Sequence, residues 1–178
     1  SLLKARSSVR ASLCGSNVRQ LGIANLSYSA DHRDYFVPAA PDVFTGFGGT
    51  RRWHGVRKSP GVSTDPAMNR FEPARSPLAR HFGRDARLKE CPGFREFVAD
   101  GARNAFEAGT GGYGYNHLYV GGRYDLYGSS PRAAVTTAQT TDLAHPASTI
   151  GFADTACLQV GPRGVSWLIE YSFTEPPL

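Results

Sequence analysis

The first thirty-two residues are the feature that most constrains how this chain can fold. Residues 1–32 contain no proline, whereas prolines punctuate the chain soon afterwards, between positions 38 and 41. Within the stretch, apolar residues recur mostly at three-, four- and seven-residue intervals: Leu3, Val9, Leu13, Cys14, Val18, Leu21 and Ala24. Such intervals place side chains on one face of an α-helix. The pattern therefore predicts one continuous helix from about residue 2 to about residue 30.

The predicted helix is longer than a compact domain of this size needs. At ~1.5 Å per residue it would extend roughly 45 Å, so one end is expected to make few contacts with its own chain. Gly15 and Gly22 interrupt the helix, and each costs about 1 kcal/mol relative to alanine. Packing against the rest of the chain must therefore hold the helix together.

The remainder of the chain is expected to form one globular domain. A chain of 178 residues with 40% apolar residues is long enough to bury a core and short for two domains. We therefore divide it into an N-terminal helix, residues 1–32, and a globular domain, residues 33–178. Residues 35–77 are crowded with glycine, proline, serine and charged residues, which predicts a long irregular loop with one or two short strands. Short helices are predicted at residues 76–83 and 94–108.

Three segments in the second half of the chain predict β-strands, at residues 111–122, 146–156 and 165–173. In the first, aromatic and small residues alternate as in a strand with one covered face. No helical crossover of adequate length separates the last two, which favours an antiparallel sheet. The predicted fold class is α+β: a long N-terminal α-helix packed on an antiparallel β-sheet with long irregular loops.

The sequence lacks the usual patterns of catalytic and metal sites. No two histidines have the spacing H-x-x-x-H, no serine lies in a G-x-S-x-G phrase, and no cysteines form a C-x-x-C pair. We therefore expect no enzymatic activity, no cofactor and no metal. The net charge is +5, but the basic residues are scattered, so nucleic-acid binding is not expected. No run of 18 apolar residues predicts a membrane span.

Two features leave alternatives open. The cysteines Cys14, Cys91 and Cys157 allow either one disulfide and one free thiol, or three buried thiols acting as small apolar residues. The phrase Asn25-Leu26-Ser27 matches the acceptor pattern for N-linked glycosylation. Because it lies inside the predicted helix, we expect it to be a chance match.

Several phrases carry a resemblance to a known family. They are Leu2-Leu3, the run Cys14-Gly15-Ser16-Asn17-Val18-Arg19-Gln20-Leu21-Gly22, Cys91-Pro92, Tyr113-Gly114-Tyr115-Asn116, and the run Pro146-Ala147-Ser148-Thr149-Ile150-Gly151-Phe152-Ala153-Asp154. Together they resemble bacterial prepilin-type proteins, and most of all the large pseudopilin-like family common in planctomycetes. In that family an apolar membrane segment precedes the first phrase, and a His-rich strand and an Asp-Gly phrase follow the last. This chain contains neither region.

The resemblance implies a pilin-like fold and a structural role. The chain would be an exported subunit of an extracellular pilus-like filament or of a secretion pseudopilus, in the cell envelope or outside the cell. Its partners would be copies of itself and other pilin-like subunits. Any membrane contact would be made only by an N-terminal segment not present in this chain. The resemblance also pairs Cys14 with Cys91 and leaves Cys157 free.

Assembly in this family implies a role for the predicted helix. Four residues would face the filament axis: Leu2, Leu3, Val9 and Leu13. Val18 and Leu21 would pack against the sheet.

Burying the helix between neighbouring subunits would leave its cations without partners, at a cost of several kcal/mol for each unpaired charge. These cations are Lys4, Arg6 and Arg10. We therefore expect acidic or carbonyl groups of adjacent subunits to meet them. The first candidates are Asp31, Asp34 and Glu170.

A second hypothesis belongs to another class of protein. Aromatic side chains hold sugars in many binding sites. The chain would then be an extracellular carbohydrate-binding module, and the candidate residues are Trp53, Tyr113, Tyr115 and Trp167.

Overall fold

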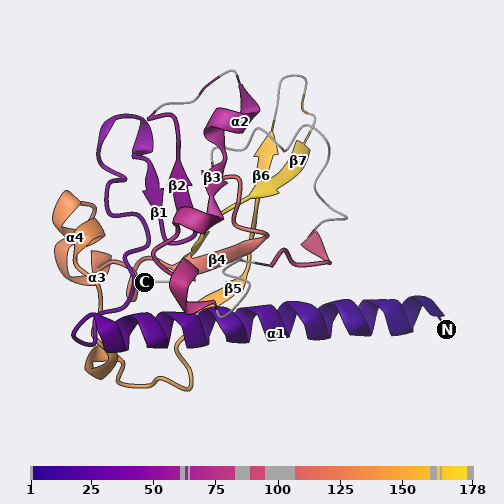
Figure 1. Cartoon of the computed structure of the whole chain (residues 1–178), viewed down its shortest axis with the longest axis horizontal. Helices are drawn as coiled ribbons and strands as arrows, with labels where there is room; N and C mark the ends of the chain where they lie inside the picture. Colours follow the sequence, from indigo (N-terminus) through magenta and orange to yellow (C-terminus); the bar gives the residue numbers. More distant parts are fainter. Residues whose placement is uncertain are drawn as a thin grey trace.

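One long helix lies along one side of a set of small β-sheets in the computed structural model of the chain (Figure 1). The structure describes residues 2–60, 63, 65–82, 89–94, 107–160, 164 and 166–175. Helix α1 covers Leu2–Asp31, and its N-terminal end projects beyond the rest of the molecule. The predicted α+β fold with a long N-terminal helix is therefore confirmed. In the described part of the chain, α1 and the other helices are too short or too polar to cross a membrane.

Only part of α1 packs against the domain. Leu21 and Ala24 are almost fully buried, and Val18 packs against the same core, which confirms the predicted contact of Val18 and Leu21 with the domain. The first turns differ, because residues 4–9 and 11–13 are exposed. The helix contacts strand β5 (Phe152–Asp154) and the 3-10 turn Ala79–His81. The helix therefore has one docked part and one free part, as its length predicted.

The loop region 35–77 contains a small antiparallel sheet. Its strands are β1 (Arg51–Arg52), β2 (Gly55–Arg57) and β3 (Phe71–Glu72), in the order β1-β2-β3. The sequence predicted one or two short strands here, so the region is more regular than expected. Val56 pairs with Glu72, which joins β3 to β2.

The second half of the chain forms the sheet that packs against α1. Its central strand is β4 (Tyr113–Asn116), which pairs antiparallel with β5 and parallel with β8 (Phe173–Thr174). Strands β6 (Ala156–Val160) and β7 (Ser166–Glu170) form a separate antiparallel pair.

The prediction of a purely antiparallel sheet was therefore correct for two strand pairs and wrong for β8. The parallel pair follows from the chain path. Strand β6 continues from β5 after one residue, β7 reverses direction, and β8 continues from β7. Strand β8 therefore runs opposite to β5 and in the same direction as β4.

The remaining helices are short. They are α2 (Pro66–Asn69), α3 (Tyr124–Tyr127) and α4 (Pro131–Val135), with 3-10 turns at Gly46–Gly48, Pro73–Arg75, Ala79–His81 and Thr140–Asp142. The helix predicted at residues 76–83 is only the turn Ala79–His81. The Ser76 hydroxyl accepts a hydrogen bond from the Leu78 backbone and donates one to the Trp53 carbonyl, 2.6 Å away, which ties this segment to the core. The helix predicted at residues 94–108 lies largely outside the described residues.

Aromatic side chains close the core between the loop region and the sheet. Trp53 is fully buried and donates its Nε1 hydrogen to the Ser172 carbonyl, 2.8 Å away. Its ring meets Phe152 edge to face, and Tyr115 stacks on Phe152 with ring centroids 4.5 Å apart. Long-range aromatic contacts, rather than regular secondary structure, therefore hold residues 35–77 in place.

The two glycines inside α1 generate a testable prediction. A Cβ atom added at Gly15 or Gly22 would meet no atom within 4 Å outside the helix's own nearby backbone. Since the backbone there is helical, Gly15→Ala and Gly22→Ala should each raise the free energy of unfolding by about 1 kcal/mol. Urea denaturation followed by circular dichroism measures the change.

Gly114→Ala is the matched control for this prediction. Its Cβ would lie 2.6 Å from the Phe173 carbonyl oxygen, so this substitution should destabilise the protein. A loss of stability in Gly22→Ala as large as that in Gly114→Ala would contradict the open surroundings of the helical glycines.

Candidate functional site: the free arm of the long helix

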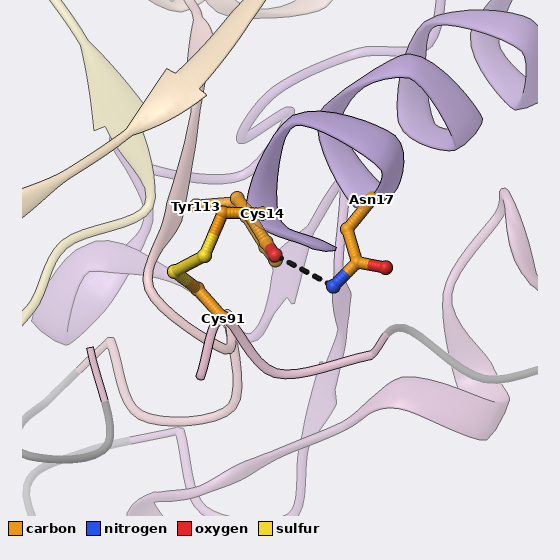
Figure 2. Close-up of a disulfide and its surroundings, with 4 residues drawn as sticks. All are labelled: Cys14, Asn17, Cys91 and Tyr113. Carbon is orange, nitrogen blue, oxygen red and sulfur yellow. Dashed lines mark hydrogen bonds between the residues drawn. A yellow bond between two sulfur atoms is a disulfide. The ribbon is translucent and has the colours of Figure 1, made fainter. Parts of the chain in front are cut away.

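A disulfide joins α1 to the domain near the middle of the helix. Cys14 and Cys91 are bonded, with their Cα atoms 5.1 Å apart across a sequence separation of 77 residues (Figure 2). Cys157 is free. This is the pairing that the family resemblance implied, and it excludes the alternative of three buried thiols. Cys14 is also the first buried residue along the described side chains of α1, so docking of the helix begins at this bond.

Two asparagines add polar ties between α1 and β4. Asn17 donates a hydrogen bond to the Tyr113 hydroxyl at 2.8 Å (Figure 2), and Asn25 donates one to the Tyr115 hydroxyl at 3.0 Å. The Asn25 side chain also accepts a hydrogen bond from the Val37 backbone. Burial raises the pKa of Tyr113 to about 12 and raises that of Tyr115 further, so both hydroxyls stay protonated. Each tyrosine therefore satisfies its buried hydroxyl through the helix.

The burial of Asn25 also decides the glycosylation question. Its side chain is buried and both of its polar atoms are used within the fold. A glycan on this nitrogen is incompatible with the folded protein. The sequon is a chance match, as predicted.

Residues 2–13 form what we call the free arm. Two of the predicted assembly residues have their side chains described: Val9 is 59% exposed and Leu13 is 49% exposed. Ile23 and Leu26 are also exposed, on the docked part of the helix. Leu2 and Leu3 belong to α1, but their side chains lie outside the described residues. The described side chains of residues 4–13 are exposed, apart from the partly buried Arg10, so the arm presents apolar side chains to solvent.

The charges on the helix are unevenly distributed. Lys4, Arg6, Arg10 and Arg19 lie in α1, and the first acidic residue is Asp31, at its C-terminal end. Cations near the N-terminus and an anion at the C-terminus have the same sign as the partial charge of the macrodipole at that end. These charges therefore destabilise the helix. In the part of the chain that the structure describes, the side chains of Lys4 and Arg6 have no ion-pair partner.

The three predicted acidic partners differ in accessibility. Asp31, the last residue of the helix, and Asp34, just after it, are exposed, so another molecule can reach them. Glu170 is not, because its carboxylate accepts hydrogen bonds from the backbone of Gly109 and Gly111 within the fold. Burial raises the pKa of Glu170 even so. Glu170 as an outer contact residue was therefore a wrong prediction.

A cavity of about 690 Å³ lies between the free arm and the start of the β6–β7 pair. The helix contributes Arg6, Ser7, Arg10, Ala11 and Cys14, and the domain contributes Cys91, Gly93, Phe94, Gly112, Asp154, Thr155 and Ala156. The wall is largely apolar, with arginines on the helix side and a carboxylate opposite. Ligand atoms of Cys14, Cys91 and Asp154 lie within 4.8 Å of one another. Because the two sulfur atoms are bonded together, they do not form a metal site in this state.

The sequence did not reveal a buried charge cluster on the other side of the core. Glu107 is fully buried and accepts hydrogen bonds from Arg52, at 2.8 Å for the closest pair, and from Ser172 at 2.6 Å. Burial alone would raise the pKa of Glu107, but the adjacent His54 imidazole and the positive charge and hydrogen bonds of Arg52 lower it to about 2. The cluster joins segments far apart in sequence and is closed to solvent, so its role is structural.

His54 is the unusual member of this cluster. It is fully buried, neither of its ring nitrogens has a hydrogen-bond partner among the described residues, and its Nε2 atom lies 3.8 Å from Glu107. That distance is too long for a hydrogen bond. Burial lowers the pKa of His54, and the imidazole is therefore neutral at neutral pH.

The aromatic residues proposed for sugar binding do not form a site. Trp53, Tyr113 and Tyr115 are fully buried in the core, while Trp167 is half-buried on β7. A glycan in solution cannot stack on the first three. As glycan contacts these three residues were wrongly predicted, and their aromatic character serves packing instead.

Comparisons of the chain with family models, with curated proteins and with solved structures find no match. The resemblance to prepilin-type proteins stays a prediction from the sequence phrases.

The buried cluster predicts how stability depends on pH. The folded pKa of His54 lies below its ordinary value of ~6.5, so stability should begin to fall as the pH drops below about 6.5. The contribution of Glu107 is present above its ordinary value near 4.5 and should be lost as the pH falls toward 2. Urea denaturation at a series of pH values from 8 to 3 measures both parts of the curve.

Two variants separate these contributions. His54→Phe should make the free energy of unfolding fall less steeply below pH 6.5, because no proton can then bind at this position. Glu107→Gln should cost about 3–5 kcal/mol at neutral pH, since it removes the closest partner of the buried Arg52 charge and leaves only Asp42, 3.9 Å away. If the free energy of unfolding of His54→Phe falls between pH 6.5 and 5 as steeply as that of the wild type, His54 does not set the acid response.

Proposed function

We propose that this protein is a structural subunit that assembles with copies of itself into a pilus-like filament or pseudopilus through α1. The observation that carries the proposal is the free arm. It is a helical segment fixed to a folded domain at Cys14, with apolar side chains exposed along it. The exposed apolar side chains of this arm are not covered within a single molecule, and in the assembly other copies of the chain cover them.

The energetics of the arm support a partner. A helical segment of about twelve residues is only marginally stable in water without tertiary packing. Fully burying one large apolar side chain contributes about 1.5–3 kcal/mol, so covering Val9, Leu13 and Ile23, each about half exposed, contributes roughly 2–4 kcal/mol per contact. Packing between helices would therefore stabilise both the arm and the assembly.

The rigid attachment of the arm supports a regular polymer. The disulfide and the two asparagine ties hold α1 at three points along β4 and its surroundings. Every copy therefore presents its arm in the same direction relative to its domain. A contact between two different surfaces of identical copies extends into an open helical filament when its rotation does not close a ring.

The disulfide also bears on where the protein works. A buried disulfide indicates an oxidising environment, such as the periplasm or the outside of the cell. We extend this to an exported subunit in the cell envelope or in an extracellular filament. The proposed role needs no catalytic group and no cofactor.

Charging the apolar surface of the arm tests the proposal. The double substitution Val9→Glu with Leu13→Glu should abolish filaments, because it places two carboxylates in the contact that assembly must bury. The domain should remain folded, since both side chains are already exposed. Negative-stain electron microscopy and sedimentation measure assembly, and thermal melting measures the fold.

Val135→Glu is the control, because Val135 is 58% exposed and lies in α4, outside the proposed interface. It should leave filaments intact. Normal filaments from the Val9/Leu13 double variant would overturn the assembly role of the helix.

A further inference from the structure

We propose that the cavity beside the free arm receives residues 31–35 of a second copy of this chain. We call residues 31–35 the acidic turn. The inference rests on the proposed function, because it assigns a specific contact within the assembly. Its basis is the complementarity between the cavity wall and an exposed segment at the end of α1 whose two carboxylates outnumber its single arginine, Arg33.

The cavity suits a small, mixed protein segment. Its floor is the Cys14–Cys91 disulfide with the Phe94 ring, which together offer an apolar surface. Arg6 stands on the helix side, is exposed and has no ion-pair partner in the described part of the chain. Because Asp154 lines the opposite wall, a segment that fills this space must bring apolar groups for the floor and place its carboxylate on the helix side, beside Arg6.

The acidic turn has this combination. Asp31 ends α1, and Asp34 follows it after two residues; both are exposed, and their carboxylates form no ion pair within the described residues. Tyr35 is 43% exposed and adds an aromatic ring next to the carboxylates. The ring would lie on the apolar floor of a neighbour's cavity, while an adjacent carboxylate meets Arg6.

The acidic turn is also held in a fixed shape. Arg33 and Asp34 have positive φ angles of 57° and 67°, which turn the chain sharply at the end of the helix. The Asp34 backbone donates a hydrogen bond to the Ser29 carbonyl at 2.9 Å, and Tyr35 pairs with Gln139 in an isolated bridge. A preformed turn loses little conformational freedom on binding.

One molecule cannot make this contact with itself. Arg6 and Asp31 lie twenty-five positions apart on one straight helix, which separates them by about 37 Å along its axis. The contact therefore joins the C-terminal end of one helix to the N-terminal arm of another. It uses two different surfaces, so it propagates, and copies along one line of contacts would repeat about every 37 Å.

The charges in this contact are expected to set the register more than the affinity. Exposed ion pairs contribute little binding energy, but wrongly juxtaposed like charges are costly. Sliding the acidic turn away from Arg6 by a few turns would take it off the cavity and away from the cation on its rim. The stagger between neighbouring helices is then selected by the match of Asp31 and Asp34 with the cationic arm.

Cysteine cross-linking tests the register. The pair Arg6→Cys with Asp31→Cys, in a Cys157→Ser background, should give a ladder of covalent oligomers after mild oxidation of assembled protein. The pair Arg19→Cys with Asp31→Cys is the matched control, because it requires a stagger of about 18 Å and should stay mainly monomeric. Mass spectrometry of the cross-linked peptides shows whether residues 6 and 31 are joined directly, and Arg6→Cys alone controls for exchange with Cys14 and Cys91.

A charge exchange provides the second measurement. Arg6→Glu and Asp31→Arg should each raise the critical concentration for assembly at least tenfold, and the double exchange should restore most of the loss. If wild-type protein forms filaments but the ladder is absent and the exchange restores nothing, this contact is wrong while the assembly role stands. If wild-type protein forms no filaments, the proposed function itself fails.

Discussion

The attachment of α1 to β4 is the interaction on which the rest of the structure depends. Tyr113 and Tyr115 are fully buried on the central strand, and each needs a partner for its hydroxyl. Asn17 and Asn25 supply those partners from one face of the helix, and the disulfide at Cys14 fixes the same face covalently. Without the helix, two buried phenols would lose their hydrogen bonds and the core would lose its cover. From Cys14 to its C-terminal end the helix is thus a part of the domain, and residues 2–13 extend away from it.

A second constraint holds the irregular half of the molecule. The loop region contributes only very short strands, so backbone pairing alone cannot fix it. Trp53 fills the core, and Arg52 beside it reaches Glu107 across the molecule. A buried ion pair of this kind adds little net stability, but it strongly disfavours arrangements that separate its members. The pair therefore selects one path for a segment that its secondary structure leaves undetermined.

The sequence revealed the parts of this fold that depend on local pattern. The helix followed from its apolar spacing, and the division between docked and free parts followed from its length. The disulfide came from the family resemblance, because residue spacing alone left the cysteines open. The pairing of Arg52 with Glu107 could not be predicted, since it depends on the path of the chain between two distant segments. Glu170 was misassigned for the same reason. Its carboxylate accepts hydrogen bonds from the backbone of Gly109 and Gly111, which are distant in sequence.

The position of Asn25 has a practical consequence for producing the protein. Glycosylating enzymes act on chains that are still unfolded, when this asparagine is accessible, and the phrase Asn25-Leu26-Ser27 is a valid acceptor for them. A sugar attached at that stage would occupy the nitrogen that later donates a hydrogen bond to Tyr115, and the helix could not pack against the domain. Expression in a eukaryotic secretory pathway would therefore yield misfolded material from a correct gene. A bacterial host that exports the chain and forms disulfides avoids the conflict.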